Sequence, residues 1–133
     1  MVNLIDTHQH LIYPDVAGYG WTAKVSPLAN RTFSLEHYAE LTVGCGVAGT
    51  LFMETGVDDT DYKTEARHVA GLASQENSGI LGLIASCRPE ENGGFSVWLD
   101  ECEALGVVGY RRILHVMPDA LSTTTTFRNN IRK

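Results

Sequence analysis

The segment LIDTHQH at residues 4–10 joins an apolar strand to the pattern Asp-x-His-x-His. Residues two apart on a β-strand point to the same face of the sheet, so Asp6, His8 and His10 are predicted to project together from the strand's C-terminal end. Two imidazoles and a carboxylate at a strand end are suited to holding a divalent metal ion or polarising a carbonyl group. The segment therefore predicts a catalytic or metal site at the start of the chain.

The composition is that of an ordinary globular domain. The chain has 133 residues, of which 44% are hydrophobic and 20% charged, enough for one domain with a real core over residues 1–133. It has no apolar run near the roughly 20 residues of a membrane span and no signal-peptide pattern, so no membrane partner is expected. Three cysteines without a C-x-x-C pair favour a reducing, cytoplasmic location. The net charge of −6 argues against a nucleic-acid partner.

The rest of the chain alternates between strand-like and helix-like segments. Strands are predicted over about 3–7, 47–53, 80–85 and 107–114, and helices over about 35–43, 62–75 and 95–105. This alternation indicates an α/β fold with a parallel sheet and right-handed crossovers. Two architectures fit the pattern: a small open doubly wound sheet, or one half of a (β/α)8 barrel, which takes about 250 residues when complete.

Polar side chains follow the predicted strands, and in both architectures sites form at the carboxyl ends of the strands. Glu54 is a candidate metal ligand, substrate contact or partner that orients a histidine. Arg111 on an inward face needs either a substrate carboxylate or hydroxyl to grip, or a buried ion pair with Glu54 or Asp6. His115 is a candidate ligand for a reacting carbonyl oxygen. These residues are expected to gather at one rim with the first-strand histidines.

A long loop follows the first strand, from Leu11 to Phe33, and contains Tyr13, Tyr19 and Trp21. Loops of this length are uncommon and often functional. We expect it to lie over the mouth of the site, where its aromatic rings would form a lid or a stacking wall, with Trp21 as a candidate substrate contact. The alternative is a loop that packs on itself.

Four segments taken together resemble one known family. They are residues 4–10, residues 47–54, the helix containing Glu65-Ala66-Arg67, and GVVGYRRILHVMPD at 106–119. The set is similar to amidohydrolase family 2, the amidohydrolase-related TIM-barrel metal-dependent hydrolases that include sugar-acid lactonases and the 2-pyrone-4,6-dicarboxylate lactonase. The last segment resembles the fuconolactonase and rhamnonolactonase group. The likeness covers the entire chain and the N-terminal half of the family's domain, so it implies the N-terminal half of a (β/α)8 TIM barrel with about four βα units.

The resemblance also implies an activity. The expected reaction is hydrolysis of a lactone or related cyclic ester or amide, a sugar-acid lactone being favoured, by attack of water at the carbonyl carbon. His8 and His10 match the family's paired first-strand histidines and would be catalytic, or metal ligands where one divalent ion, zinc favoured, is bound; a metal-independent reaction is the alternative. His115 and Arg111 match the polar positions of the fourth strand, as catalytic and substrate-binding residues for a small molecule.

Family barrels also use histidines from later strands and an Asp at the end of the last strand as general base. None of these corresponds to a residue of this chain, so whether it acts alone as an enzyme is left open. One alternative is a metal-dependent nuclease of the TatD type, whose first strand also carries Asp-x-His-x-His. Another is an inactive half-barrel with two open sheet edges, which would pair with itself as a homo-oligomer or with a complementary half-barrel chain.

Overall fold

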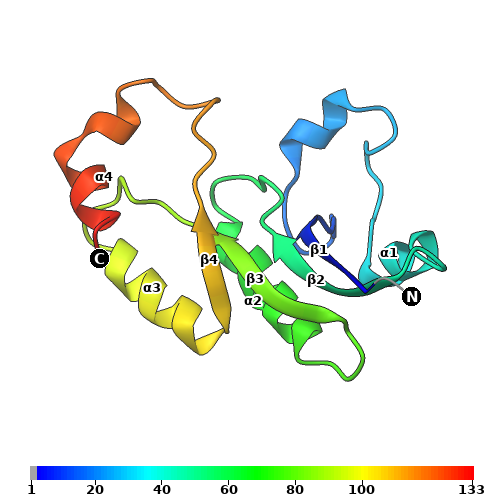
Figure 1. Ribbon diagram of the computed structural model, residues 1–133. Coiled ribbons are helices and arrows are strands. Elements are labelled where there is room, and N and C mark those ends of the chain that lie inside the picture. Colours follow the sequence, from blue (N-terminus) through cyan, green and yellow to red (C-terminus); the bar gives the residue numbers. More distant parts are fainter. Residues whose placement is uncertain (1–2) are drawn as a thin grey trace.

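The computed structural model describes residues 3–133, which form an α/β fold around one four-stranded sheet (Figure 1). Neighbouring strands are parallel and follow the order β1-β2-β3-β4. The strands are β1 (Leu4–Gln9), β2 (Val47–Met53), β3 (Ile80–Ser86) and β4 (Val107–Arg111). The helices are α1 (Leu35–Leu41), α2 (Tyr62–Ala73), α3 (Phe95–Ala104) and α4 (Thr125–Asn130), with short 3-10 helices η1 (Gly20–Lys24) and η2 (Leu121–Thr123). Within residues 3–133, no helix has the length and apolarity needed to cross a membrane.

Local sequence signals set the helix ends. At the start of α1 the Ser34 hydroxyl accepts a hydrogen bond from the His37 backbone N–H, and the His37 ring accepts one from the Ser34 N–H. This reciprocal cap satisfies two donors that a helix start leaves free. Gly44 and Gly106, which follow α1 and α3, both have positive φ values near +75°, a conformation that glycine adopts without strain.

Two strand ends that bear on the candidate site residues differ from the sequence prediction. β1 runs to Gln9, so its histidine motif lies partly within the strand, whereas β4 ends at Arg111 and not at Leu114. The Cys87 N–H, just after β3, donates a hydrogen bond to the Arg111 carbonyl at the end of β4. Beyond Arg111 the chain leaves the sheet. His115 consequently lies in a turn beyond the strand end.

β-Bulges interrupt the start of each strand pairing. Ile80 and Gly82 of β3 lie opposite consecutive residues of β2, so Leu81 is an extra residue in β3. Val108 is the extra residue of β4 in the same way. A bulge breaks the two-residue alternation of side chains locally, so Leu81, the extra residue of β3, and Leu83 differ in exposure at 60% and 2%.

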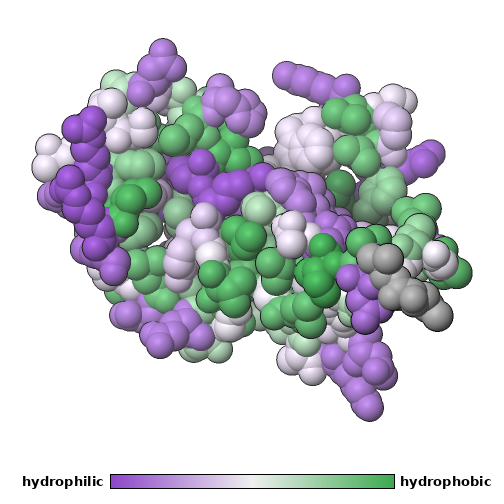
Figure 2. All heavy atoms as spheres, in the orientation of Figure 1, coloured by the Kyte–Doolittle hydropathy of each residue, from purple (hydrophilic) through white to green (hydrophobic). Residues whose placement is uncertain are grey.

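The two faces of the sheet have different surroundings. On the outer face, which α2 and α3 cover, Phe52 and Leu83 pack beneath α2 and Ala85 packs against Trp98 of α3. In Figure 1, α2 lies behind the sheet, so the viewer sees the other, inner face. Figure 2 shows apolar side chains spread over this inner face. The inner face is the one that a complete barrel would enclose.

Candidate functional site

The two histidines of the first strand lie in contact. Their ring centroids are 4.8 Å apart with the planes at 81°. Between Asp6 and Gln9 the pairing of β1 with β2 shifts register, so β1 contains one residue more than β2 over this stretch. This bulge places the histidine pair at the strand end, in keeping with the way bulges re-aim side chains beside sites.

The prediction that Asp6, His8 and His10 together form a metal-binding group is wrong, since residues 3–133 contain no cluster of three such side chains. One carboxylate oxygen of Asp6 accepts the Tyr38 hydroxyl of α1 at 2.6 Å, and the other accepts the His8 N–H at 2.9 Å. These two hydrogen bonds lower the pKa of Asp6. The sequence pattern assumed regular alternation, which the bulge removes.

His10 is oriented by the neighbouring strand. Its Nδ1 lies 2.9 Å from the carbonyl oxygen of Met53, and because a carbonyl can only accept, Nδ1 carries the hydrogen. In the neutral ring Nε2 then has a free lone pair. Burial lowers the pKa of His10, which favours this neutral form. A backbone carbonyl on one ring nitrogen is the arrangement that orients histidines for metal binding.

Arg111 and Glu54 form an ion pair beside His10. Arg111 Nε donates to Glu54 Oε1, and its Nη2 donates to the Glu54 backbone carbonyl at 2.8 Å. Glu54 is buried, and its second oxygen accepts the Gly56 N–H at 3.0 Å. Of the two roles expected for Arg111, the structure therefore shows the ion pair with Glu54. Arg111 also lines the cavity, and within residues 3–133 its hydrogen bonds use Nε and Nη2 and not Nη1.

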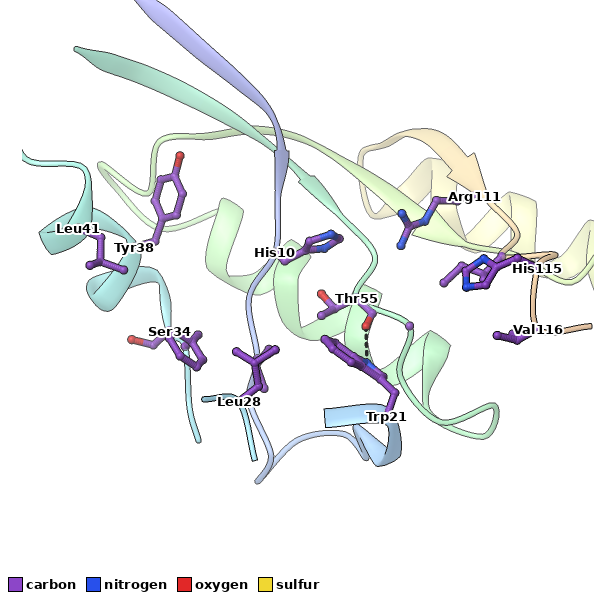
Figure 3. A pocket seen from close by; sticks show the side chains of 14 residues that line it. His10, Trp21, Leu28, Ser34, Tyr38, Leu41, Thr55, Arg111, His115 and Val116 are labelled. Carbon is purple, nitrogen blue, oxygen red and sulfur yellow. Dashed lines mark hydrogen bonds between the residues drawn. The ribbon is translucent and has the colours of Figure 1, made fainter. Parts of the chain in front are cut away.

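A cavity of about 580 Å³ opens at this end of the sheet (Figure 3). His10, Arg111 and His115 reach it from the ends of β1 and β4 and from the turn after β4. Trp21 of η1 forms another wall and donates its Nε1–H to the Thr55 carbonyl at 2.9 Å. Much of the remaining lining is apolar: Ile12, Leu28, Phe33, Leu41, Ile113 and Val116.

The predicted site residues therefore divide into two groups. His10, Trp21, Arg111 and His115 surround one cavity, while Glu54 lies buried behind Arg111. His8 is exposed and reaches the group only through its contact with His10, because it does not line the cavity. The part of the chain that the structure describes contains no cluster of three His, Cys, Asp or Glu side chains able to hold a metal ion.

Sequence reasoning missed Glu65, which supports the cavity wall from α2. Its carboxylate accepts the Thr55 N–H at 3.0 Å, and the Thr55 carbonyl holds Trp21. Burial raises the pKa of Glu65 to about 7, and the nearby Glu54 charge adds to the shift. Glu65 lies three residues after Tyr62 and four before Val69, both buried on the same helix face. That spacing was the signal that an acidic side chain faces inward.

Comparison with known proteins adds information about the fold. No protein-family model and no curated protein matches the sequence. Among solved structures, an amidohydrolase 2 from Bifidobacterium longum subsp. infantis is similar, with a TM-score of 0.70 and 21% identity over 99% of this chain and 47% of that one. A zinc-bound amidohydrolase from Burkholderia multivorans has a TM-score of 0.75 at 14% identity, over 98% of this chain and 44% of that one.

A third similar structure is a probable 2-pyrone-4,6-dicarboxylic acid hydrolase from Acinetobacter baumannii, solved with citric acid bound. It has a TM-score of 0.69 and 16% identity, over 98% of this chain and 45% of that one. The chain thus spans about half the length of the amidohydrolases it resembles. Its four parallel βα units are the N-terminal half of a (β/α)8 barrel.

Proposed function

We propose that the cavity is the N-terminal part of a hydrolase site for a lactone or related cyclic ester or amide, with a sugar-acid lactone as the favoured substrate. The observation that carries the proposal is the convergence of His10, Arg111 and His115 on one cavity at the carboxyl ends of the strands. Parallel α/β folds place their sites at this end. Similar folds occur in amidohydrolases, one of them a probable pyrone-dicarboxylic acid hydrolase.

The lining fits a ring-shaped substrate that carries an acidic or hydroxyl group. Apolar side chains and the Trp21 ring offer a surface on which a lactone ring packs. Arg111, held in place by Glu54, keeps one guanidinium nitrogen available to bind a carboxylate or hydroxyl oxygen. When water attacks the carbonyl carbon, negative charge develops on the carbonyl oxygen, and N–H donors from Arg111 and His115 would stabilise it.

A divalent metal ion is compatible with only part of this site. Nε2 of His10 has the free lone pair that a metal ligand needs, and the His8 ring lies beside it. Zinc sites, however, take at least three protein ligands, and residues 3–133 provide no group of three. The metal-binding proposal is therefore confined to His8 and His10 as two ligands of a larger set, and no catalytic step is assigned to the ion.

Binding and turnover of sugar-acid lactones test the proposal. The full chain would be titrated calorimetrically with a panel of aldonates, the hydrolysis products, and assayed with the matching lactones using a pH indicator. We expect aldonate binding that the Arg111→Met substitution weakens by about tenfold or more, because a charge-assisted hydrogen bond is lost. Arg128→Met, which changes an exposed arginine of α4, is the matched control and should leave binding unchanged.

Two further variants separate the site from the surface. His10→Ala should reduce any lactone turnover and aldonate binding, whereas Glu40→Ala, at an exposed position of α1 outside the cavity, should not. Aldonate binding that is absent, or equal in the Arg111 and Arg128 variants, would contradict the proposal. Cleavage of single-stranded DNA in place of lactones would favour a nuclease of the TatD type.

A further inference from the structure

Exposed large apolar side chains are concentrated at the two open sides of the half-barrel. They occur on β1, at the end of α1 next to it, on the inner face of the sheet, and on β4 and the segments that follow. These residues are Leu4, Ile5, Leu41, Val43, Leu81, Val108, Tyr110, Leu114, Val116 and Ile131. Trp21 of η1 and Val25, which follows η1, are also exposed and lie in the loop after β1. On α2 and α3, which cover the outer face, Val97 is the one such side chain within residues 3–133. Contiguous exposed apolar patches of this kind are typical of surfaces on which another protein surface docks.

The bulges aim two of these side chains at the inner face. A Cβ placed on Gly49 of β2 would lie 2.6 Å from Leu81, and one on Gly82 of β3 would lie 2.9 Å from Val108. The two side chains therefore lie across glycines of the neighbouring strand, on the side of the sheet away from the helices. Leu81 is 60% exposed and Val108 64% exposed. Burying them from water is favourable.

The sheet edges define how a covering partner must approach. β1 and β4 are the two edges of an all-parallel sheet, and each offers unpaired backbone groups on its open side. When β4 of one copy pairs in parallel with β1 of another copy, the strand order β1-β2-β3-β4 of the first copy continues into that of the second. Two copies give eight strands, the number at which a barrel interior is just filled by side chains.

Charge at the two edges is complementary. Beside β1, α1 carries Glu36 and Glu40 and no lysine or arginine. Beyond β4, the C-terminal end of the chain carries Arg128, Arg132 and Lys133. In a head-to-tail arrangement the basic end of one copy faces the acidic helix of the other, which favours that orientation over an edge meeting its own kind.

We propose that two copies of this chain associate head to tail, with β4 of each copy beside β1 of the other, to close an eight-stranded parallel barrel. The inner faces of both copies form the barrel interior, and Leu81 and Val108 become buried in it. A head-to-tail contact closes when the rotation between copies completes a ring, and the twofold axis of this ring runs along the barrel. The proposal rests on the fold and does not depend on the proposed lactone chemistry.

Sedimentation equilibrium of the full chain tests the association. We expect a species of twice the chain mass of 14.5 kDa that dissociates on dilution. Val108→Lys should raise the dissociation constant by on the order of a hundredfold, because a charge enters the closed interior. Val97→Lys is the matched control: Val97 is 66% exposed on the outer helix α3, and its variant should dimerise normally. Circular dichroism checks that both variants fold, and Leu81→Lys serves as a second inner-face variant.

Cross-linking tests the head-to-tail arrangement. With the exposed Cys45 replaced by serine, a short thiol cross-linker should join Ile5→Cys chains to Val108→Cys chains in a mixture. It should not join Ile5→Cys chains to one another, because the two β1 strands lie on opposite sides of the ring. A monomer at all concentrations, open-ended polymers, or cross-links between two β1 strands would each overturn the proposal. So would a dimer that Val97→Lys and Val108→Lys weaken equally.

Discussion

The outer and inner faces of the same sheet differ in how deeply their apolar side chains are buried. Leu83 of β3 is 2% exposed and packs beneath α2, whereas Leu81 of the same strand is 60% exposed on the inner face. Two identical residues of one strand thus occupy opposite environments, because Leu81 is the extra residue of a β-bulge. The outer face is packed beneath helices, whereas large apolar side chains of the inner face are exposed within residues 3–133.

The residues that stabilise the fold and the candidate site residues lie on different sides of the sheet. The helix-covered face contains Trp98 and Cys102, both almost fully buried, and the free energy of folding comes mainly from such burial. The candidate site residues His10, Arg111 and His115 lie on the open side instead, at the mouth of the inner face. Substitutions on the two sides should therefore affect different measurements.

The sharpest test of this comparison is a pair of matched substitutions in β3. Leu83→Ala should lower the free energy of unfolding by about 2–5 kcal/mol, because it leaves a cavity in the core beneath α2. Leu81→Ala should change it by less than about 0.5 kcal/mol in the monomer, since the side chain is already in contact with water. Urea unfolding at concentrations low enough to keep the chain monomeric measures both. Equal losses would show that the inner face is packed after all.

The ion pair at the mouth of the inner face should be the next most sensitive feature. Glu54→Gln should destabilise the chain by about 3 kcal/mol, because it leaves the Arg111 guanidinium, itself only partly exposed, without its charged partner. Glu101→Gln is the matched control, since Glu101 pairs with Arg67 on the exposed surface and such pairs contribute about 0–1 kcal/mol. Thermal unfolding of the two variants compares them. If both shifts were small, the pair would be a solvent-exposed contact.

The sequence was sufficient to predict the strand–helix order and the parallel sheet, because those depend on hydrophobic periodicity that survives one extra residue. Periodicity left a doubly wound sheet and a half-barrel open, and the choice of the half-barrel came from the family resemblance. It also placed His10, Arg111 and His115 at one rim, since parallel strands end at the same edge. It did not reveal the bulges, because an extra residue in a strand leaves no mark in an apolar run. Asp6 was therefore assigned to the wrong neighbours.

Side-chain partners were harder to predict than strand positions. The pairing of Arg111 with Glu54 was one of two alternatives, and choosing between them requires the distance between two strands that are far apart in the sequence. Glu65 was overlooked because an acidic residue in a helix is usually exposed. Its position among buried residues of α2 follows from helical spacing and was available in the sequence.

The buried carboxyl group of Glu65 should make the free energy of unfolding depend on pH. Its folded pKa of about 7 lies above the ordinary glutamate value, so the folded chain binds an extra proton between about pH 4.5 and 7. Stability from this group is fully present below about pH 4.5 and is lost as the pH rises to about 7, by on the order of 3 kcal/mol. Glu54 and Arg111 both act on Glu65, with opposite signs.

Glu65→Gln should remove this dependence while keeping a carbonyl to accept the Thr55 N–H. The variant should therefore gain stability relative to the original chain as the pH rises from 5 to 8. Urea unfolding across that range, with tryptophan fluorescence as a second probe, measures the difference. Parallel curves for the two proteins would mean that Glu65 is ionised in the folded chain and that its burial is not costly.

The smallest expected effect tests the boundary between the two faces, where β1 meets α1. Tyr38→Phe removes the hydroxyl that donates to Asp6 at 2.6 Å and should cost about 0.5–1 kcal/mol, because the pair is only partly buried. Combining it with Asp6→Asn in a double-mutant cycle isolates the coupling between the two side chains. A coupling near zero would mean that solvent replaces the bond. Asp6 would then be free to turn toward His8 and His10, as the regular alternation of a strand predicts.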